Sequence, residues 1–487
     1  MAENRKDLSM MRLIRWTAVV WIFALPLTGC EPVATGVEDL DLVIAGSRVM
    51  DPESGLDEIM NVGVREGRIE VITTDNLEGK TFIEGSGLVL APGFIDLHEH
   101  AQTDEGYRLM VRDGVTTALE LEVGTGDVAG WYDQRQEGQV VNYGVSIGHI
   151  PVRMAVMGDE GTFLPIGAGG SAIATDQQIS EMISMLEQGL AQGAVAMGFG
   201  MAYTPGATYE EFGTMLEVAK AANVSSHIHI RGGVEGVRRT IEVAGEVGAP
   251  LHVVHANSSG GEAITEFLAV IEEAVSSDQD VSTEVYPYGA GMTEIGSALF
   301  DDWENYTDAQ FSMHQWVATG ERLNRETFGK YRSQGGKVII HGRSEEATRA
   351  GVVHPLTMIA SDGFVEEGRA HPRTSGTFSK VLGRYVRDEG SLSLMEALRK
   401  MTLMPAQRLE RAVPQMENKG RIRVGADADL VVFDADQIMD RSTYEDGTIP
   451  SSGVEYVVVN GQVVLRSGDL IEGVKPGRPV RVRAELN

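Results

Sequence analysis

The sequence predicts an α/β protein whose main domain is a (β/α)8 barrel, joined to a small β-sandwich formed from both chain ends. Between residues 91 and 423, short apolar runs alternate with amphipathic helical segments through eight rounds. Histidines and acidic residues follow the ends of several apolar runs, where a barrel of this kind carries its active site. Short alternating segments at 39–90 and 424–475 predict the two parts of the sandwich.

Each apolar run predicts one barrel strand. In chain order the runs cover residues 94–97, 115–122, 143–147, 194–199, 224–229, 250–254, 281–286 and 356–360. Helical periodicity between them is clearest over residues 176–192, 209–222, 235–247 and 262–275. Strands that alternate with helices run parallel, so their C-terminal ends meet at one face of the barrel.

The predicted sandwich rests on short strand-like segments at both ends of the fold. The segments cover residues 41–45, 62–64, 70–72, 81–83, 428–434 and 454–465. Asn460-Gly461 is a typical hairpin turn within the last of them. The two chain ends are therefore expected to pair in one β domain beside the barrel.

The first 29 residues resemble a lipoprotein signal peptide. Arg12 and Arg15 precede an apolar stretch at 16–26, which is too short for an ordinary membrane span. The stretch ends in a Leu-Thr-Gly-Cys sequence, and Cys30 is the only cysteine of the chain. We expect lipidation at Cys30, a tether at 30–38, and an exported bacterial lipoprotein anchored to a membrane surface in the cell envelope, either in the periplasm or at the outer membrane. The alternative is a plain signal peptide with an incidental cysteine.

The chain of 487 residues has 41 basic and 71 acidic residues, which gives a formal net charge of −30. Such a negative surface repels nucleic acid, so nucleic-acid binding is disfavoured. It would also slow the approach of anionic small molecules, and a local group of arginines would have to offset that repulsion.

The strongest chemical signal is the pair His98 and His100 at the end of the first barrel strand. Alternate strand residues share a face, so both imidazoles point the same way and can hold a divalent metal such as zinc. His229 and His255 follow two later strands, and Asp362 follows the last one. An aspartate at that position can take a proton from a metal-bound water and pass it to a leaving amine.

Ten short motifs in this order resemble the amidohydrolase superfamily, and their details resemble its N-acyl-D-amino-acid deacylase (D-aminoacylase) family. The resemblance covers roughly residues 40–470. The motifs are APGFIDLHEHAQ at 91, GVTT at 114, GHIPVR at 148, GFGMAYTPGA at 198, HIRGG at 229, VVHANSSG at 253, YPYGAG at 286, IASDG at 359, HPRTSGTF at 371 and KMTLMPAQRL at 400.

The resemblance implies a role for each matched residue. His98 and His100 would bind the more exposed metal, His229 and His255 the tighter one, and Asp362 would be the catalytic aspartate. The residues it places around the substrate are His149, Arg153, Arg231, Tyr286, Tyr288 and Arg373. Arginine suits a substrate carboxylate because its planar fork donates two parallel charge-assisted bonds.

Two positions depart from the family pattern. Where typical members carry a cysteine ligand after the second strand, this chain has Glu120 and Glu122 on one strand face, and we favour Glu122 because it lies nearer the strand end. Whether one metal or two bind is left open. Asn257 replaces a family lysine, which weakens the hold on a substrate carboxylate or shifts that task to an arginine.

The function that the resemblance implies is hydrolysis of the amide bond of N-acyl-D-amino acids, with one or two divalent ions, zinc first among them. A dipeptidase acting on a C-terminal D-residue breaks the same bond and stays open. A cyclic-amide hydrolase is a further alternative, although no lysine stands at the end of the 194–199 strand to support the carboxylated-lysine centre of that branch. A non-catalytic binding lipoprotein is disfavoured, since a binder need not keep Asp362.

Overall fold

The computed structural model describes residues 39–482, so the predicted signal peptide, the tether and Cys30 lie outside the described residues. Residues 39–482 belong to one compact unit. Within the described range, none of the helices combines the length and the apolar character that a membrane crossing requires.

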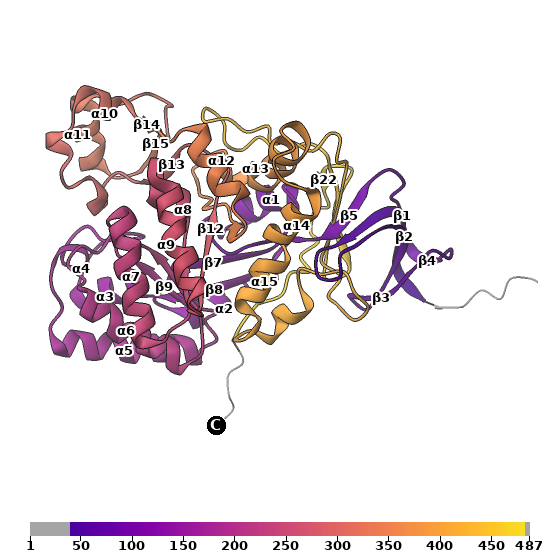
Figure 1. Ribbon diagram of the computed structural model, residues 1–487, viewed down its shortest axis with the longest axis horizontal. Coiled ribbons are helices and arrows are strands. Elements are labelled where there is room, and N and C mark those ends of the chain that lie inside the picture. The colour runs from indigo at the N-terminus through magenta and orange to yellow at the C-terminus, as the bar shows by residue number, and fades with distance from the viewer. Residues whose placement is uncertain (1–38, 483–487) are drawn as a thin grey trace, which may run out of the picture. The chain divides into compact units, whose positions relative to one another are not determined.

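The centre of the fold is a nearly closed parallel barrel of eight strands in the order β6-β7-β8-β9-β10-β11-β12-β16 (Figure 1). The strands are β6 (Phe94–Asp96), β7 (Val115–Thr125), β8 (Asn142–Gly148), β9 (Met197–Gly200), β10 (Ser226–His229), β11 (Leu251–Val253), β12 (Val281–Val285) and β16 (Thr357–Ile359). Just beyond the first and last strands, the Asp362 amide donates to the His98 carbonyl at 2.7 Å and the His100 amide donates to the Gly363 carbonyl at 2.9 Å. The predicted (β/α)8 fold class is confirmed.

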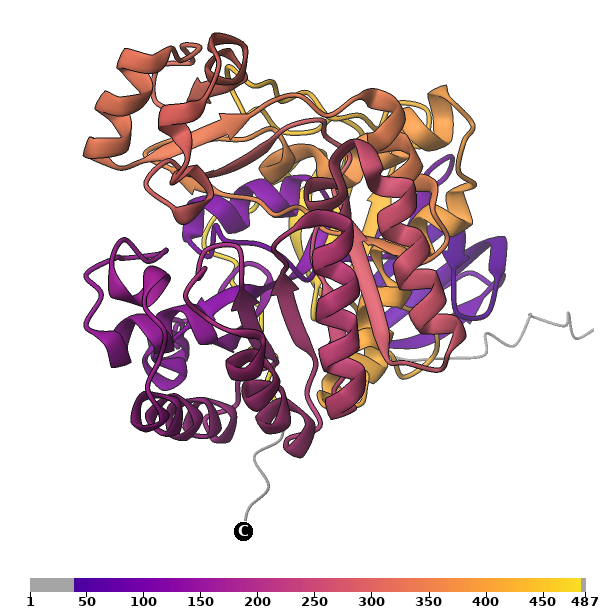
Figure 2. The same ribbon diagram turned by 60° about the vertical axis from the view of Figure 1, so that its left-hand side comes forward.

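Helices cover the outside of the barrel, as the two ribbon views show for α5, α6, α7 and α9 (Figures 1 and 2). They are α1 (Asp104–Arg112), α2 (Val128–Asp133), α3 (His149–Met157), α4 (Ala168–Ser171), α5 (Asp176–Ala191), α6 (Tyr209–Ala221), α7 (Gly233–Val247), α8 (Ala256–Gly260), α9 (Ile264–Ser276), α12 (Glu345–Val353), α13 (Arg373–Lys380), α14 (Leu394–Met401) and α15 (Leu403–Glu410). Local sequence fixes several starts: Thr175 and Gln178 form a capping box on α5, and Thr208 caps α6.

Strands from both chain ends join in one β domain, as predicted, and by hydrogen bonding they form a single sheet of nine strands. The strands are β1 (Leu40–Asp51), β2 (Leu56–Arg65), β3 (Arg68–Thr73), β4 (Gly79–Glu84), β5 (Val89–Pro92), β19 (Leu430–Phe433), β20 (Val454–Val459), β21 (Gln462–Arg466) and β22 (Asp469–Leu470). The two halves meet where β5 pairs antiparallel with β19. Asn460, with a φ of 47°, makes the predicted turn between β20 and β21.

A buried polar network ties this domain to the barrel. The Asp429 carboxylate, just before β19, accepts from Asn142 of β8 at 2.9 Å and from Lys419 Nζ at 2.6 Å. Its other oxygen accepts the Asn460 amide at 2.7 Å. Buried charges are tolerated when every one is paired, and here the lysine also reaches Asp427 at 3.0 Å.

An insertion between β12 and β16 forms a small unit that the sequence did not reveal. It contains the three-stranded antiparallel sheet β13 (Gly291–Glu294), β15 (Lys337–Ile340) and β14 (His314–Trp316), with α10 (Asp308–Ser312) and α11 (Arg325–Gln334). Its core is largely aromatic and includes Phe300, Phe311 and Phe328. In both ribbon views this unit lies apart from helices α5 to α7 (Figure 2).

Candidate active site

The C-terminal ends of the barrel strands bring the predicted ligands together in two groups. His98, His100, Glu122 and Asp362 form one group, and Glu122, His229 and His255 form the other. All are buried except His100 and His229, which are partly exposed. Donor atoms from five separate strand ends therefore meet at a single point, as a barrel active site requires.

Glu122 stands between the two groups and offers one oxygen to each. Its Oε2 lies 2.7 Å from His98 Nε2 and 3.2 Å from His100 Nε2, and its Oε1 lies 2.9 Å from His229 Nδ1. On the second side, His255 Nε2 lies 3.1 Å from His229 Nδ1. A carboxylate in this position is placed to bridge two cations.

The spacing of these donors fits a bound divalent ion. Tetrahedral coordination at a metal–nitrogen distance of about 2.0–2.1 Å puts neighbouring ligand atoms about 3.3 Å apart. The Nε2 atoms of His98 and His100 are 3.2 Å apart, and each lies within 3.6 Å of Asp362 Oδ1. Neutral imidazole and carboxylate are the ligand types that zinc and similar ions take, so the donor set fits one ion in each group.

Outer carboxylates orient the first pair of imidazoles. The Nδ1 atoms of His98 and His100 face Glu284, at 2.6 Å, and Glu120. A proton held on Nδ1 leaves Nε2 free as a ligand, the usual arrangement behind metal-binding histidines. Glu120 also accepts the amides of Val123 and Gly124. The geometry thus favours Glu122 as the ligand and Glu120 as the residue that positions His100.

Sequence reasoning missed the outer part of this network inside the barrel. Glu284 of β12 also contacts His252 Nε2 at 3.1 Å, and His252 Nδ1 meets Ser282 Oγ at 2.7 Å. His227 packs against His252 with ring centroids 4.6 Å apart, outside both ligand groups. The available signal was Glu284, an acidic residue within a largely buried strand.

Asp362 lies against the first group and is paired with Arg373. Its Oδ1 faces His98 and His100, while its Oδ2 lies 2.7 Å from Arg373 Nη1. Burial opposes its ionisation, yet Arg373 and His98 hold the pKa of Asp362 below its usual range. Asp362 and His255 are both held at positive φ, 51° and 32°, a backbone conformation that non-glycine residues adopt at a cost and that is often found at functional sites.

Charge controls the protonation of the histidines. Burial opposes protonation of His98, but the carboxylates of Asp362, Glu284 and Glu122 raise its pKa well above the usual range, so a divalent ion that binds Nε2 must displace a proton from it. His255, buried and beside His229, has its pKa lowered to about 3, so it is neutral and able to act as a ligand at pH 7.

His149 and Arg153 lie on α3, where both contact Glu211 of α6. Glu211 Oε1 lies 2.8 Å from His149 Nε2 and 2.6 Å from Arg153 Nη1, and the guanidinium also donates to the Gly169 carbonyl at 2.8 Å. Arg153 is fully buried with its charge satisfied inside the protein. Its contacts therefore assign it a structural role in joining two helices, and the predicted substrate contact of this pair finds no support in them.

Of the remaining residues predicted to contact the substrate, some lie beside Asp362 and Arg373 and others hold neighbouring segments in place. Tyr286 lies beside Arg373, whose guanidinium carbon is 4.6 Å from the tyrosine ring centre. Tyr288 donates its hydroxyl to Asp440 at 3.0 Å. Arg231 donates to the carbonyls of Pro205 and Ala207 and so holds the loop after β9.

A small cavity of about 20 Å³ borders the metal cluster. Its lining residues are His100, Glu122, Val123, Phe163, Tyr203, Met292, Thr293, Lys337, Asp362 and Phe364. This space is close to the minimum for one water molecule, so an organic substrate enters only after the lining side chains shift. Lys337 of the insertion is 4% exposed, pairs with Glu294 at 2.9 Å, and lies 3.9 Å from the centre of the Phe364 ring.

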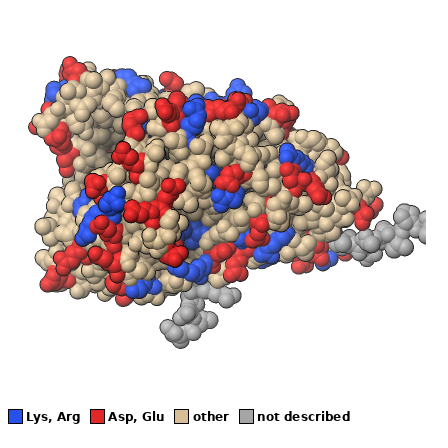
Figure 3. Space-filling model, viewed as in Figure 1, with Lys and Arg blue, Asp and Glu red and all other residues tan. Residues whose placement is uncertain are grey.

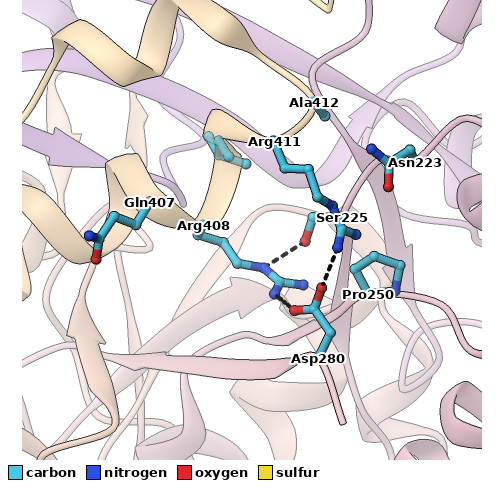
Figure 4. Close-up of a pocket in the computed structure, with 9 residues that line it drawn as sticks. Asn223, Ser225, Pro250, Asp280, Gln407, Arg408, Arg411 and Ala412 are labelled. Carbon is cyan, nitrogen blue, oxygen red and sulfur yellow. Dashed lines mark hydrogen bonds and ion pairs between the residues drawn. The ribbon is translucent and has the colours of Figure 1, made fainter. Parts of the chain in front are cut away.

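A larger cavity of about 150 Å³ lies at the opposite, N-terminal end of the barrel strands (Figure 4). There Arg408 and Arg411 of the α15 region both reach Asp280, which precedes β12. Arg408 also donates to Ser225 Oγ at 3.0 Å. Residues at this end of a barrel serve stability, so the cavity is separate from the candidate active site.

On the face shown in Figure 3, acidic and basic side chains are intermixed, and no continuous basic surface is present on it.

A (β/α)8 barrel with a histidine–carboxylate cluster and an aspartate after its last strand defines the class of metal-binding barrel hydrolases. Two models described as Amidohydrolase family match residues 89–275 and 233–465. The chain belongs to the amidohydrolase family and is a hydrolase of carbon–nitrogen bonds in linear amides.

Characterised relatives extend over nearly the whole chain. It is 28% identical to an N-acyl-D-glutamate deacylase of Alcaligenes xylosoxydans xylosoxydans, over 92% of this chain and 98% of the relative. It is 29% identical to a D-aminoacylase of the same organism, over 88% of this chain and 95% of the relative.

Solved structures agree with these relatives. The N-acyl-D-glutamate deacylase from Bordetella bronchiseptica, determined with zinc and a phosphonate inhibitor, superposes with a TM-score of 0.78 at 26% identity, over 91% of this chain and all of that one. A D-aminoacylase structure gives a TM-score of 0.75 at 27% identity with the same coverage. The predicted resemblance to the D-aminoacylases is confirmed.

Proposed function

We propose that this protein is an N-acyl-D-amino-acid deacylase that uses one or two divalent ions, zinc first among them. The observation that carries the proposal is Glu122, which offers one oxygen to each histidine pair while Asp362 lies beside the first pair. The similarity to D-aminoacylases and N-acyl-D-glutamate deacylases supports the choice of substrate class.

His98, His100, Glu122, His229 and His255 would hold the ions. A divalent ion bound there supplies a Lewis acid and lowers the pKa of water toward neutrality. Asp362 is ionised at neutral pH because Arg373 and His98 lower its pKa, so its Oδ1 can accept the proton of the attacking water. The same oxygen then returns the proton to the nitrogen of the leaving D-amino acid.

Two aromatic rings shield the reacting groups from bulk solvent. Phe163 and Phe364 pack with ring centres 5.6 Å apart, and Phe163 lies 5.3 Å from the ring of His100. An apolar cover strengthens the electrostatic interactions beneath it. Arg373 holds Asp362 through Oδ2, which keeps Oδ1 directed at the cluster.

The experiment is hydrolysis by signal-free protein with added zinc, using paired N-acetyl-D- and N-acetyl-L-amino acids and a few L-Xaa-D-Xaa dipeptides. Release of amine from the D-substrates alone is the expected result. Cleavage of the dipeptides only would select the dipeptidase alternative, and equal rates on D- and L-substrates would contradict the proposal.

We also propose that the protein is an exported lipoprotein anchored through Cys30. The sequence before Cys30 supports this, with two arginines, an apolar stretch and a lipobox-like end. Expressed in bacteria, the wild-type protein should take up labelled fatty acid and remain with the membrane fraction, whereas Cys30→Ser should do neither. Equal membrane retention of both proteins, without labelling, would count against the anchor.

A further inference from the structure

Asn257 stands where the family motif has a lysine, and its side chain forms hydrogen bonds within the protein. Its side-chain amide donates to the Tyr286 carbonyl at 2.9 Å and accepts the Tyr286 amide at 3.4 Å. It is 1% exposed. Asn257 therefore fixes the backbone of Tyr286 and brings no positive charge to the substrate.

A different cation reaches the same place from the insertion. Arg343 follows β15, and its Nη2 donates to the Tyr286 hydroxyl at 2.7 Å. Its Nη1 lies 3.5 Å from Oγ of Ser258, the residue next to Asn257. The arginine thus occupies the neighbourhood that the missing lysine leaves without charge.

The charge of Arg343 is unpaired. Within residues 39–482, no carboxylate oxygen lies within 4.0 Å of its guanidinium, and its buried Nε has no hydrogen-bond partner. By contrast, Arg373, which also lies beside Tyr286, is paired with Asp362. The guanidinium carbons of Arg343 and Arg373 lie 5.3 Å and 4.6 Å from the centre of the Tyr286 ring. One arginine with a paired charge and one with an unpaired charge thus lie beside this tyrosine.

The same polar groups surround Gly291, the first residue of β13. A Cβ placed there would lie 3.1 Å from the Tyr286 hydroxyl. It would also lie 3.7 Å from Ser258 Oγ and 3.8 Å from Arg343 Nη1. Three polar groups thus converge on a residue without a side chain. A carboxylate accepts hydrogen bonds from hydroxyls and from a guanidinium, and it can reach these three once their side chains shift to admit it.

We propose that Arg343, with the hydroxyls of Tyr286 and Ser258, binds the α-carboxylate of the substrate in place of the lysine absent at position 257. This inference rests on the proposed function, because it assigns a specificity-determining residue to the same site. A charge-assisted bond from an arginine supplies the fixed anion contact, and it offsets the repulsion that a chain of net charge −30 exerts on an anionic substrate.

The test compares Arg343→Met with Arg343→Lys and with the control Arg322→Met, an exposed arginine of the same insertion. Each zinc-loaded protein is titrated calorimetrically with two non-hydrolysable probes, N-methylphosphonyl-D-alanine and its carboxamide counterpart. Thermal unfolding of each variant checks that it is folded.

For Arg343→Met we expect the Kd of the carboxylate probe to rise about 10- to 100-fold, from the strength of a hydrogen bond to a charged group. The Kd of the carboxamide probe should change less than threefold. Arg343→Lys should recover part of the loss, and Arg322→Met should resemble the wild type. With N-acetyl-D-amino acids, Arg343→Met should raise KM by a similar factor and leave kcat within about threefold.

Unchanged binding of both probes, or equal weakening of both, would overturn the inference. A wild type that binds the carboxylate probe through Arg343 but hydrolyses no N-acyl-D-amino acid would instead overturn the proposed function and leave the anion contact in place.

Discussion

Replacing Glu211 by Gln tests whether His149 and Arg153 support the fold or contact the substrate. The Arg153 side chain is fully buried, with an exposure of 0%. Its ionic partner is Glu211, at 2.6 Å. Removing one partner of a buried ion pair costs about 3–5 kcal/mol. Because the Gly169 and Ala172 carbonyls still accept from the guanidinium, we expect the lower end, about 3 kcal/mol.

The expected shift in melting temperature follows from the size of the folded unit. At about 2.1 cal/mol/K per residue, residues 39–482 unfold with an entropy of roughly 0.9 kcal/mol/K. A loss of about 3 kcal/mol therefore lowers Tm by about 3 °C. Differential scanning calorimetry measures this shift, and Glu210→Gln, an exposed neighbour on α6, provides the control.

The kinetic result separates the two roles. If Glu211 only positions α3 against α6, Glu211→Gln should leave the KM for N-acetyl-D-amino acids within about twofold of the wild type. An unchanged Tm combined with a tenfold or larger rise in KM would refute the structural role and return His149 and Arg153 to the substrate site.

Three further changes have definite expected outcomes. Glu122→Gln should lose bound metal, measured by elemental analysis. Glu120→Gln should keep the metal with an affinity weakened about 10- to 100-fold, because Glu120 acts through His100. Loss of metal from Glu120→Gln, with metal retained by Glu122→Gln, would contradict the assignment. Lys419→Met should lower the free energy of unfolding in urea by about 3–5 kcal/mol by leaving buried Asp429 without its cation, and exposed Lys330→Met should not. Removing metal with a chelator should abolish hydrolysis and added zinc should restore it; full activity in metal-free protein would show that the cluster is not catalytic.

The barrel could be predicted because its strands and helices have strong, simple patterns. Buried parallel strands give continuous apolar runs, and amphipathic helices such as α5 and α7 give a 3.6-residue period. The direction of alternate strand residues also placed His98 and His100 on one face, and the position of Glu122 nearer the strand end favoured it over Glu120. In the structure Glu122 lies between the two histidine pairs.

Other features depend on contacts between distant residues, which no local pattern encodes. The insertion has strands of three or four residues and takes its stability from a largely aromatic core assembled over residues 295–338. Arg153 and Arg343 have the same side-chain chemistry, yet one is neutralised by Glu211 and the other has no carboxylate within 4.0 Å among residues 39–482. The family motifs placed Arg153, together with Arg231 and Arg373, around the substrate and did not point to Arg343.

The most direct test of the proposed hydrolytic centre is to measure metal content and turnover together in Asp362→Asn. We expect zinc to remain bound, because this substitution leaves three candidate ligands unchanged in each group. They are His98, His100 and Glu122 in the first group, and Glu122, His229 and His255 in the second. Turnover of N-acetyl-D-amino acids should fall at least 100-fold, the lower range for loss of a general acid–base group. Retained turnover with zinc bound would contradict the role of Asp362 and, with it, the mechanism proposed for this site.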